Sequence, residues 1–381
     1  MMKFIFWLLL FSIGYTYFGY PILMAILLKI KKNKLVNKAE IFPLVSIVIA
    51  AYNEEKNIGA KISDLLNLDY PREKMEITVV SDFSTDQTDE IVRSFADRGV
   101  KLVRLEKRSG KIDAYRNVLP DLKGEIIVFS DATSLLDRYS IGKLINNFND
   151  PTVGCVGGLL MYINPKNALV GKGERKYWSY EKRIREYESK LDSLPSVSGT
   201  LYAVRKELFP LDMKEYLADD LIIPLIVKKK GYRTVFEKGA ICKDFTTITI
   251  KEEMAKRIRI TVQNIRGLLD QLEILNFFKY GIFSLLVFSH KVLRLLIPIF
   301  LLVLFICNII LITQHYLYSL ILLAQLLFYV MGIFGHQLNK KIKLTAANTS
   351  FYFCLSNISI FIGILEFIKG NRVTTWETVR T

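Results

Sequence analysis

The chain has 381 residues, 51% of them apolar, and its 52 Lys and Arg against 37 Asp and Glu residues give a formal net charge of +15. This length exceeds that of one small domain, and the apolar content with a mean hydropathy of +0.26 is high for a wholly soluble protein, so part of the chain is expected to lie in lipid. The excess of positive charge favours an anionic membrane surface or a phosphate-bearing ligand over nucleic acid. Four cysteines without paired spacing indicate no disulfide framework.

The first 32 residues have the pattern of a membrane anchor. Residues 4–28 carry no charged side chain, and about 20 apolar residues suffice to cross the hydrocarbon core of a bilayer. A cleaved signal peptide is the alternative, but the run is long and no small-residue cleavage site precedes Lys29. We therefore predict an uncleaved transmembrane anchor over residues 1–32. Because several lysines follow it directly, the positive-inside rule places the next domain in the cytoplasm.

Residues 44–275 have the pattern of an α/β domain. Short β-branched runs alternate there with amphipathic segments, which predicts a mostly parallel sheet flanked by helices. Asn53 and Glu54 follow the first predicted strand, Asp82 follows the second, and Asp131 follows the fourth. Ligands bind outside the carboxyl ends of strands in such sheets, so these groups predict one shared site. The expected strands are 45–51, 76–81, 100–105 and 125–130.

Several polar residues near these strand ends suit phosphate and proton chemistry. Asp131 offers the hard oxygen that a diphosphate-bound metal prefers, although a strand-end Asp can also be a cap or turn residue. Gly110 and Lys111 begin an amphipathic helix, where backbone N–H groups and a lysine can face a phosphate. Asp219 and Asp220 precede another helix. Asp219 could cap that helix, whereas Asp220 could act as a general base.

Basic residues are concentrated on the last helix of this domain, predicted over about residues 251–275. Lys256 and Arg259 share one face of it, and a solvated basic face beside a membrane is the alternative interpretation. After this helix we predict an interfacial helix at 276–292, about three transmembrane helices within 293–368 and a polar tail at 369–381. The chain is therefore expected to be a multi-pass membrane protein.

Seven segments, taken in their order along the chain, resemble the membrane-bound family 2 glycosyltransferases. The likeness is closest to the branch that contains cellulose, hyaluronan and poly-N-acetylglucosamine synthases, and it covers residues 44–275. It implies a GT-A fold, which is a Rossmann-like, mostly parallel α/β sheet, here with transmembrane helices at both ends of the chain. The segments are AYNEE (51–55), VVSDFSTDQT (79–88), RSGKIDAYRN (108–117), FSDAT (129–133), SGTLYAVR (198–205), ADDL (218–221) and KRIRI (256–260).

The resemblance also implies roles for particular residues. Asp220 would be the general base, Arg259 would stabilise the leaving diphosphate, and Asp131 would hold Mg²⁺ or Mn²⁺. The residues expected to bind the nucleotide-sugar are Ala51, Tyr52, Asn53, Glu54, Asp82, Lys111 and Arg257. Those expected along the path of the acceptor are Ser198, Gly199, Thr200, Trp178 and Glu181.

Some positions depart from the family's pattern. Thr133 stands where many relatives have a second metal-binding carboxylate. Ile260 replaces a tryptophan that stacks on the acceptor sugar in polymerising relatives, so a lipid or short acceptor becomes credible. Ser81 and Phe83 replace the usual neighbours of Asp82, and the contacts to base and ribose are expected to differ in detail.

The function expected from these features is an inverting hexosyl transfer. A sugar, glucose or N-acetylglucosamine, would move from a UDP-sugar to a glycan or lipid acceptor at the cytoplasmic membrane face, in polysaccharide or glycolipid synthesis. The alternative is a catalytically inactive subunit that binds nucleotide or glycan in a synthase complex. No nucleic acid partner is expected.

Overall fold

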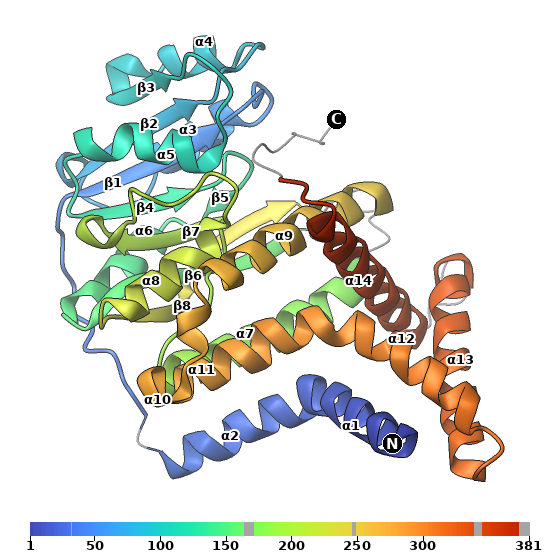
Figure 1. Cartoon of the computed structure of the whole chain (residues 1–381). Helices are drawn as coiled ribbons and strands as arrows, with labels where there is room; N and C mark the ends of the chain where they lie inside the picture. The colour runs from blue at the N-terminus through green and yellow to red at the C-terminus, as the bar shows by residue number, and fades with distance from the viewer. Residues whose placement is uncertain (32, 164–170, 246–248, 339–344, 373–381) are drawn as a thin grey trace.

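The computed structural model describes residues 1–31, 33–163, 171–245, 249–338 and 345–372, with the side chains of 171–178, 335–338, 345 and 346 outside the description. Its centre is an eight-stranded sheet in the order β3-β2-β1-β4-β7-β6-β8-β5 (Figure 1). The strands are β1 Val45–Ala51, β2 Met75–Ser81, β3 Val100–Arg104, β4 Ile126–Ser130, β5 Leu135–Leu136, β6 Val153–Ile163, β7 Leu201–Arg205 and β8 Arg233–Phe245.

The first four strands confirm the predicted parallel sheet. β1 pairs in parallel with both β2 and β4, and β2 pairs in parallel with β3. β7 then runs antiparallel to β4 and β6, whereas β6 and β8 are parallel to each other. The four later strands were not predicted. The carboxyl ends of β1, β2 and β4 therefore open at one edge of the sheet, as ligand binding in this fold class requires.

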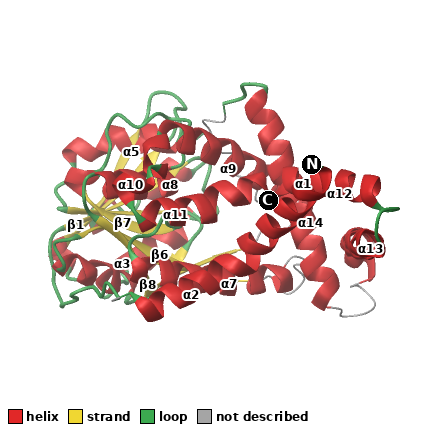
Figure 2. Cartoon of the chain, turned by 60° about the horizontal axis from the view of Figure 1, so that its bottom comes forward, coloured by secondary structure: helices red, strands yellow, loops and turns green. Residues whose placement is uncertain are grey.

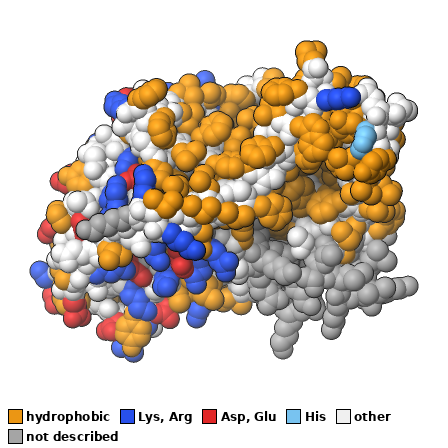
Figure 3. All heavy atoms as spheres, turned by 90° about the horizontal axis from the view of Figure 1, so that it is seen from below, with side chains coloured by type: hydrophobic (Ala, Val, Ile, Leu, Met, Phe, Trp, Pro, Cys, Tyr) orange, Lys and Arg blue, Asp and Glu red, His pale blue; other side chains and the backbone are white. Residues whose placement is uncertain are grey.

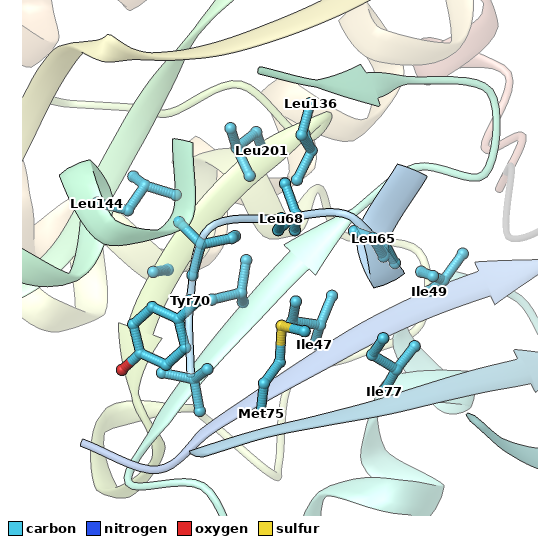
Figure 4. Packing of buried hydrophobic residues seen from close by; sticks show 14 of the residues in the cluster. Ile47, Ile49, Leu65, Leu68, Tyr70, Met75, Ile77, Leu136, Leu144 and Leu201 are labelled. Atoms are coloured by element: carbon cyan, nitrogen blue, oxygen red, sulfur yellow. The ribbon is translucent and has the colours of Figure 1, made fainter. Parts of the chain in front are cut away.

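Helices cover both faces of the sheet because its central strands are apolar on both sides. Along β1, Ile47 and Ile49 belong to one core cluster and Val48 to the other, as the two-residue repeat of a strand dictates. Figure 4 shows Ile47 and Ile49 in one buried cluster with Leu65 of α3 and Leu144 of α6. The helices of this first face are α3 Ile58–Leu66, α4 Thr88–Arg93 and α6 Ser140–Ile145; those of the second are α5 Lys111–Val118 and α8 Asp219–Lys229.

A third cluster joins the domain to the helices at the ends of the chain. Leu221 and Leu225 of α8 pack there with Leu268 of α9 (Ile250–Asp270), Tyr20 of the N-terminal helix and Phe283 after α9. The long helix α7 (Gly171–Leu191) packs in the same cluster and runs beside α2 (Figure 2). The terminal helices are α1 Met2–Gly14, α2 Tyr20–Ile30, α10 Phe277–Tyr280, α11 Ile282–Val287, α12 Leu293–Leu311, α13 Tyr316–Leu338 and α14 Thr345–Ile368.

Within the described residues, four helical runs are long and apolar enough to cross a membrane: Met2–Ile30, Ile282–Leu311, Tyr316–Phe334 and Ala347–Ile368. On the face seen in Figure 3, hydrophobic side chains dominate one end of the molecule, while most of the visible charged side chains lie at the other end. The segment expected to lie in the membrane interface, 276–292, divides at Gly281. Its second half continues without a break into α12.

A buried polar contact ties three of these helices together. The Glu188 carboxylate of α7 is fully buried, and one of its oxygens accepts a hydrogen bond from the Tyr20 hydroxyl of α2 at 2.6 Å. The same oxygen lies 2.6 Å from Nδ1 of His290, in the π-helical segment Phe288–Val292 that joins α11 to α12. This contact therefore links the N-terminal helix and the first C-terminal run through α7.

Replacing Glu188 should loosen that link. In Glu188→Ala the Tyr20 hydroxyl and the His290 ring lose their common buried partner, and breaking such a buried pair costs about 3 kcal/mol. We expect a clearly lower unfolding temperature in detergent. Arg183→Ala, which alters an exposed residue of the same helix, is the matched control. Equal unfolding temperatures for the two variants would contradict this role of Glu188.

Candidate active site

Hydrogen bonds connect the loop after β1 to the loop after β2. Asn53 adopts a left-handed conformation with φ of +52°, which asparagine tolerates better than most residues. Its side-chain oxygen accepts a hydrogen bond from the Thr85 N–H at 2.9 Å, and the Glu54 N–H donates to the Thr88 hydroxyl at 2.8 Å. Beside them, the Arg108 guanidinium lies 3.7 Å from the centre of the Tyr52 ring. Ala51 is the buried last residue of β1.

Asp82 organises the loop that leads into α5. Its side chain is fully buried, and its two oxygens accept hydrogen bonds from the N–H groups of Ser109 at 2.7 Å and Gly110 at 2.9 Å. Gly110 has a φ of +94°, a conformation that favours glycine. Asp82 thereby fixes the start of α5, and with it the next residue, Lys111.

Lys111 stands at the centre of a cluster of charged groups. Its ammonium lies 3.1 Å from an oxygen of Asp131, at the end of β4, and 3.5 Å from an oxygen of Asp219 on α8. It also donates to the Gly199 carbonyl at 3.3 Å. Burial disfavours the charged ammonium, but the Asp131 and Asp219 carboxylates outweigh burial and hold the pKa of Lys111 well above its usual value.

The two neighbouring carboxylates of α8 have different surroundings. Asp219 accepts a hydrogen bond from the buried Tyr202 hydroxyl at 2.7 Å and lies close to Lys111. Burial and the negative charge of Asp219 raise the pKa of Asp220 to about 6. The nearby positive charges of Lys291, Lys111 and Arg185 lower this pKa but do not outweigh the first two effects. A carboxylate that gains a proton near neutral pH has the property required of a general base.

Arg259 completes the cluster from α9. A capping box formed by Thr249 and Glu252 starts this helix. Thr261, two residues beyond Arg259, faces Gly363 of α14. A Cβ added at Gly363 would lie only 2.6 Å from the Thr261 Cβ, so α9 and α14 pack too closely there for a larger residue. Burial lowers the pKa of Arg259, whereas its neighbours Asp131, Asp220 and Asp219 counteract this. We call Lys111, Asp131, Asp219, Asp220 and Arg259 the strand-end cluster.

The carboxylate oxygens of this cluster suit a divalent cation that is also bound by phosphate. Within the described part of the chain, no three His, Cys, Asp or Glu side chains are grouped as a complete metal shell. Asp131 keeps 37% of its side chain exposed and is free to offer an oxygen outward. Mg²⁺ in phosphate sites is held by one or two carboxylates, with phosphate oxygens and water completing the shell. Asp131 is the residue that would hold such an ion here.

The expected acceptor residues fall into two groups. Ser198, Gly199 and Thr200 lie beside the strand-end cluster, since the Gly199 carbonyl accepts from Lys111 and a Cβ added at Gly199 would lie 3.8 Å from the Asp220 Cβ. Glu181 is instead almost fully buried, 3.2 Å from Nε2 of His290 and paired with Arg294. The Glu181 carboxylate therefore connects α7 to the run Ile282–Leu311.

Arg257, which is also proposed from the sequence, contacts residues outside the strand-end cluster. Arg257 pairs with Glu253 one turn earlier on α9, at 2.6 Å, and reaches the Tyr352 hydroxyl of α14. The side chain of Trp178 lies outside the described residues. Conversely, sequence reasoning missed Tyr202, because its contact with Asp219 arises only when β7 packs against α8.

Comparison with known proteins identifies the domain. Residues 46–210 match the family described as Glycosyl transferase family 2. A probable glycosyltransferase YdaM of Bacillus subtilis is 28% identical over 214 residues, covering 52% of this chain and 50% of that protein. The β-monoglucosyldiacylglycerol synthase of Nostoc is 30% identical over 188 residues, covering 47% and 40%. The poly-β-1,6-N-acetyl-D-glucosamine synthase of Staphylococcus aureus is 25% identical over 222 residues, covering 56% and 53%.

A solved structure matches nearly the whole chain. The mannosyltransferase PcManGT from Pyrobaculum calidifontis, in complex with GDP-Man and Mn²⁺, superposes with a TM-score of 0.71 and 22% identity, covering 98% of this chain and 100% of that one. The fold is thus of the GT-A type. Residues 46–210 are similar to family 2 glycosyltransferases, the resemblance that the sequence motifs indicate. The chain spans about half the length of the curated relatives it matches.

The raised pKa of Asp220 predicts a stability penalty at high pH. Because the folded value of about 6 exceeds the ordinary 3.8, the folded chain binds the proton more tightly, and this stabilisation is lost as pH rises through 6. Such a difference is worth at most about 3 kcal/mol, and we expect ~2 kcal/mol for this half-buried side chain. Asp220→Asn should therefore unfold at a higher temperature than the native chain at pH 8, with little gain at pH 4. A gain independent of pH would contradict this assignment.

Proposed function

We propose that this chain is an inverting glycosyltransferase that uses a nucleotide-sugar donor and a divalent metal. The observation that carries the proposal is the strand-end cluster itself. Four segments far apart in sequence bring a candidate metal ligand, a carboxylate with raised pKa and two cations to one edge of the sheet. Transfer at an anomeric carbon requires a base for the incoming hydroxyl and charge neutralisation of the departing diphosphate.

In the proposed reaction, Asp220 takes the proton of an acceptor hydroxyl as that oxygen bonds to the anomeric carbon. The bond from this carbon to the donor phosphate breaks, and the diphosphate leaves with the electron pair. Lys111 and Arg259 offset the negative charge that develops on it. Mg²⁺ or Mn²⁺, held by Asp131, would supply additional neutralisation when bound.

A single displacement that inverts the anomeric centre is the simplest mechanism for this set of residues. Asp219, the carboxylate adjacent to the base, already accepts from Tyr202 and lies beside Lys111. It is poorly suited to form a covalent intermediate with the sugar. One base without a second nucleophilic carboxylate favours inversion of an α-linked donor to a β-linked product.

We propose a UDP-sugar, carrying glucose or N-acetylglucosamine, as the donor. The names of two relatives, a β-monoglucosyldiacylglycerol synthase and a poly-β-1,6-N-acetyl-D-glucosamine synthase, support these sugars. The structural relative was solved with GDP-Man, so a GDP-sugar belongs in any test. The base and ribose would lie against Ala51 to Glu54, and the acceptor, a glycan or a lipid, would approach Ser198, Gly199 and Thr200.

We further propose that the catalytic domain faces the cytoplasm, with residues 276–281 in the membrane interface. Phe278 is 99% exposed and Phe277 is 58% exposed, directly before the run Ile282–Leu311. Aromatic side chains favour the headgroup region of a bilayer. The lysines that follow the N-terminal helix support the same orientation.

Turnover by the purified protein tests this function. The protein in nanodiscs is mixed with UDP-glucose, UDP-N-acetylglucosamine or GDP-mannose, together with Mn²⁺ and membrane lipids or oligosaccharide primers, and released nucleoside diphosphate is measured. We expect turnover of one donor, abolished by EDTA. It should fall roughly 100-fold or more in Asp220→Asn, since general bases contribute at least this much.

Asp97→Asn, which alters an exposed carboxylate of the same domain, should keep full activity. Nucleotide binding without turnover of any donor would contradict the proposal and favour a non-catalytic binding subunit. Undiminished activity in Asp220→Asn would remove Asp220 from the mechanism.

A further inference from the structure

A lysine is fully buried behind the strand-end cluster. Lys61 belongs to α3, and none of its surface is exposed. Its ammonium donates hydrogen bonds to the Ser130 hydroxyl at 2.8 Å and to the Ser134 carbonyl at 2.6 Å. Among the described residues, no carboxylate lies within ion-pair distance of it. Its hydrogen-bonding partners are neutral, which is unusual for a buried cation.

This arrangement is costly for the fold. Removing an ammonium group from water is unfavourable, and neutral hydrogen-bond partners compensate only part of the loss. Burial accordingly lowers the pKa of Lys61, while Cys242, Asp64 and Asp131 act in the opposite direction. An apolar side chain of similar length would cost less free energy to bury at this position, so packing alone does not account for a lysine.

Its hydrogen bonds lead to both sides of the proposed reaction centre. Ser134, which lies three residues after Asp131, donates from its hydroxyl to the Asp131 carbonyl at 2.9 Å. Ser130, the last residue of β4, donates to the Thr200 carbonyl at 2.9 Å. One ammonium thus braces the turn that presents Asp131 and, through Ser130, the segment expected to meet the acceptor.

We propose that Lys61 is a positioning residue that holds the turn from Asp131 to Ser134 in the geometry required to bind a divalent cation together with a nucleoside diphosphate. This inference rests on the proposed function. The lysine acts through Ser130 and Ser134 and does not itself touch the ligand. Its ammonium is bound to Ser130 and Ser134 and does not occupy the Asp131 oxygens that would bind the metal.

The test measures metal binding and stability separately. Binding of Mn²⁺ to the 381-residue chain in detergent, with UDP or GDP present, is followed by electron paramagnetic resonance, which also reports the symmetry of the bound ion. Lys61→Met should keep or raise the unfolding temperature, because an apolar side chain replaces a buried cation. It should also weaken Mn²⁺ binding about 10-fold and alter the spectrum, as expected when a group that orients a metal ligand is removed.

Two further variants serve as comparisons. Lys206→Met removes a lysine that donates to the carbonyls of Pro120 and Leu122, away from the strand-end cluster, and should leave Mn²⁺ binding unchanged. Ser134→Ala removes the hydrogen bond to the Asp131 carbonyl but keeps Lys61. It should weaken Mn²⁺ binding in the same direction but less, and it tests the link if Lys61→Met fails to fold.

Each other outcome overturns the inference. Native Mn²⁺ affinity in Lys61→Met would mean that the lysine does not position the metal site. Loss of affinity in proportion to lost stability, with Ser134→Ala like the native chain, would reduce Lys61 to a structural residue. If the native chain binds no Mn²⁺ with either nucleotide, the proposed function itself fails, a result separate from any difference between variants.

Discussion

The arrangement of the site depends on cations placed among three carboxylates that would otherwise repel one another. Lys111 lies between Asp131 and Asp219, within reach of both, and Arg259 interacts electrostatically with all three aspartates. Without these cations, close carboxylates in a partly buried site would take up protons. The same two cations are available to a diphosphate when a donor binds, so the forces that stabilise the cluster also prepare it for its proposed ligand.

The helices at the ends of the chain take part in building this site. α14, which is apolar enough to cross a membrane, packs so closely on α9 that Gly363 meets Thr261 directly, two residues from Arg259. Elsewhere, Glu188 of α7 joins α2 to the helical run Ile282–Leu311. Arg259 belongs to the GT-A domain, whereas the helix that packs beside it, α14, belongs to the C-terminal helices. The domain and the terminal helices therefore form one structural unit.

Local sequence patterns predicted the first half of the sheet, because its apolar runs and the polar residues after them, such as Asp131, follow from short-range rules. The order of β5 to β8 depends on long-range pairing and could not be predicted. Arg257 and Glu181 show the same limit, since packing against α14 and α12 decides which way each side chain points. Lys61 was missed because a lysine on an amphipathic helix is expected to face solvent, and only the hydroxyl groups around it explain its burial.

The most direct measurement of the central claim is diffraction at the manganese absorption edge from crystals of the full chain grown with Mn²⁺ and UDP. The account predicts one strong anomalous peak in direct contact with the Asp131 carboxylate, with the diphosphate between this ion and the side chains of Lys111 and Arg259. A nucleotide bound at the strand ends without metal at Asp131, or a manganese ion bound elsewhere, would contradict it.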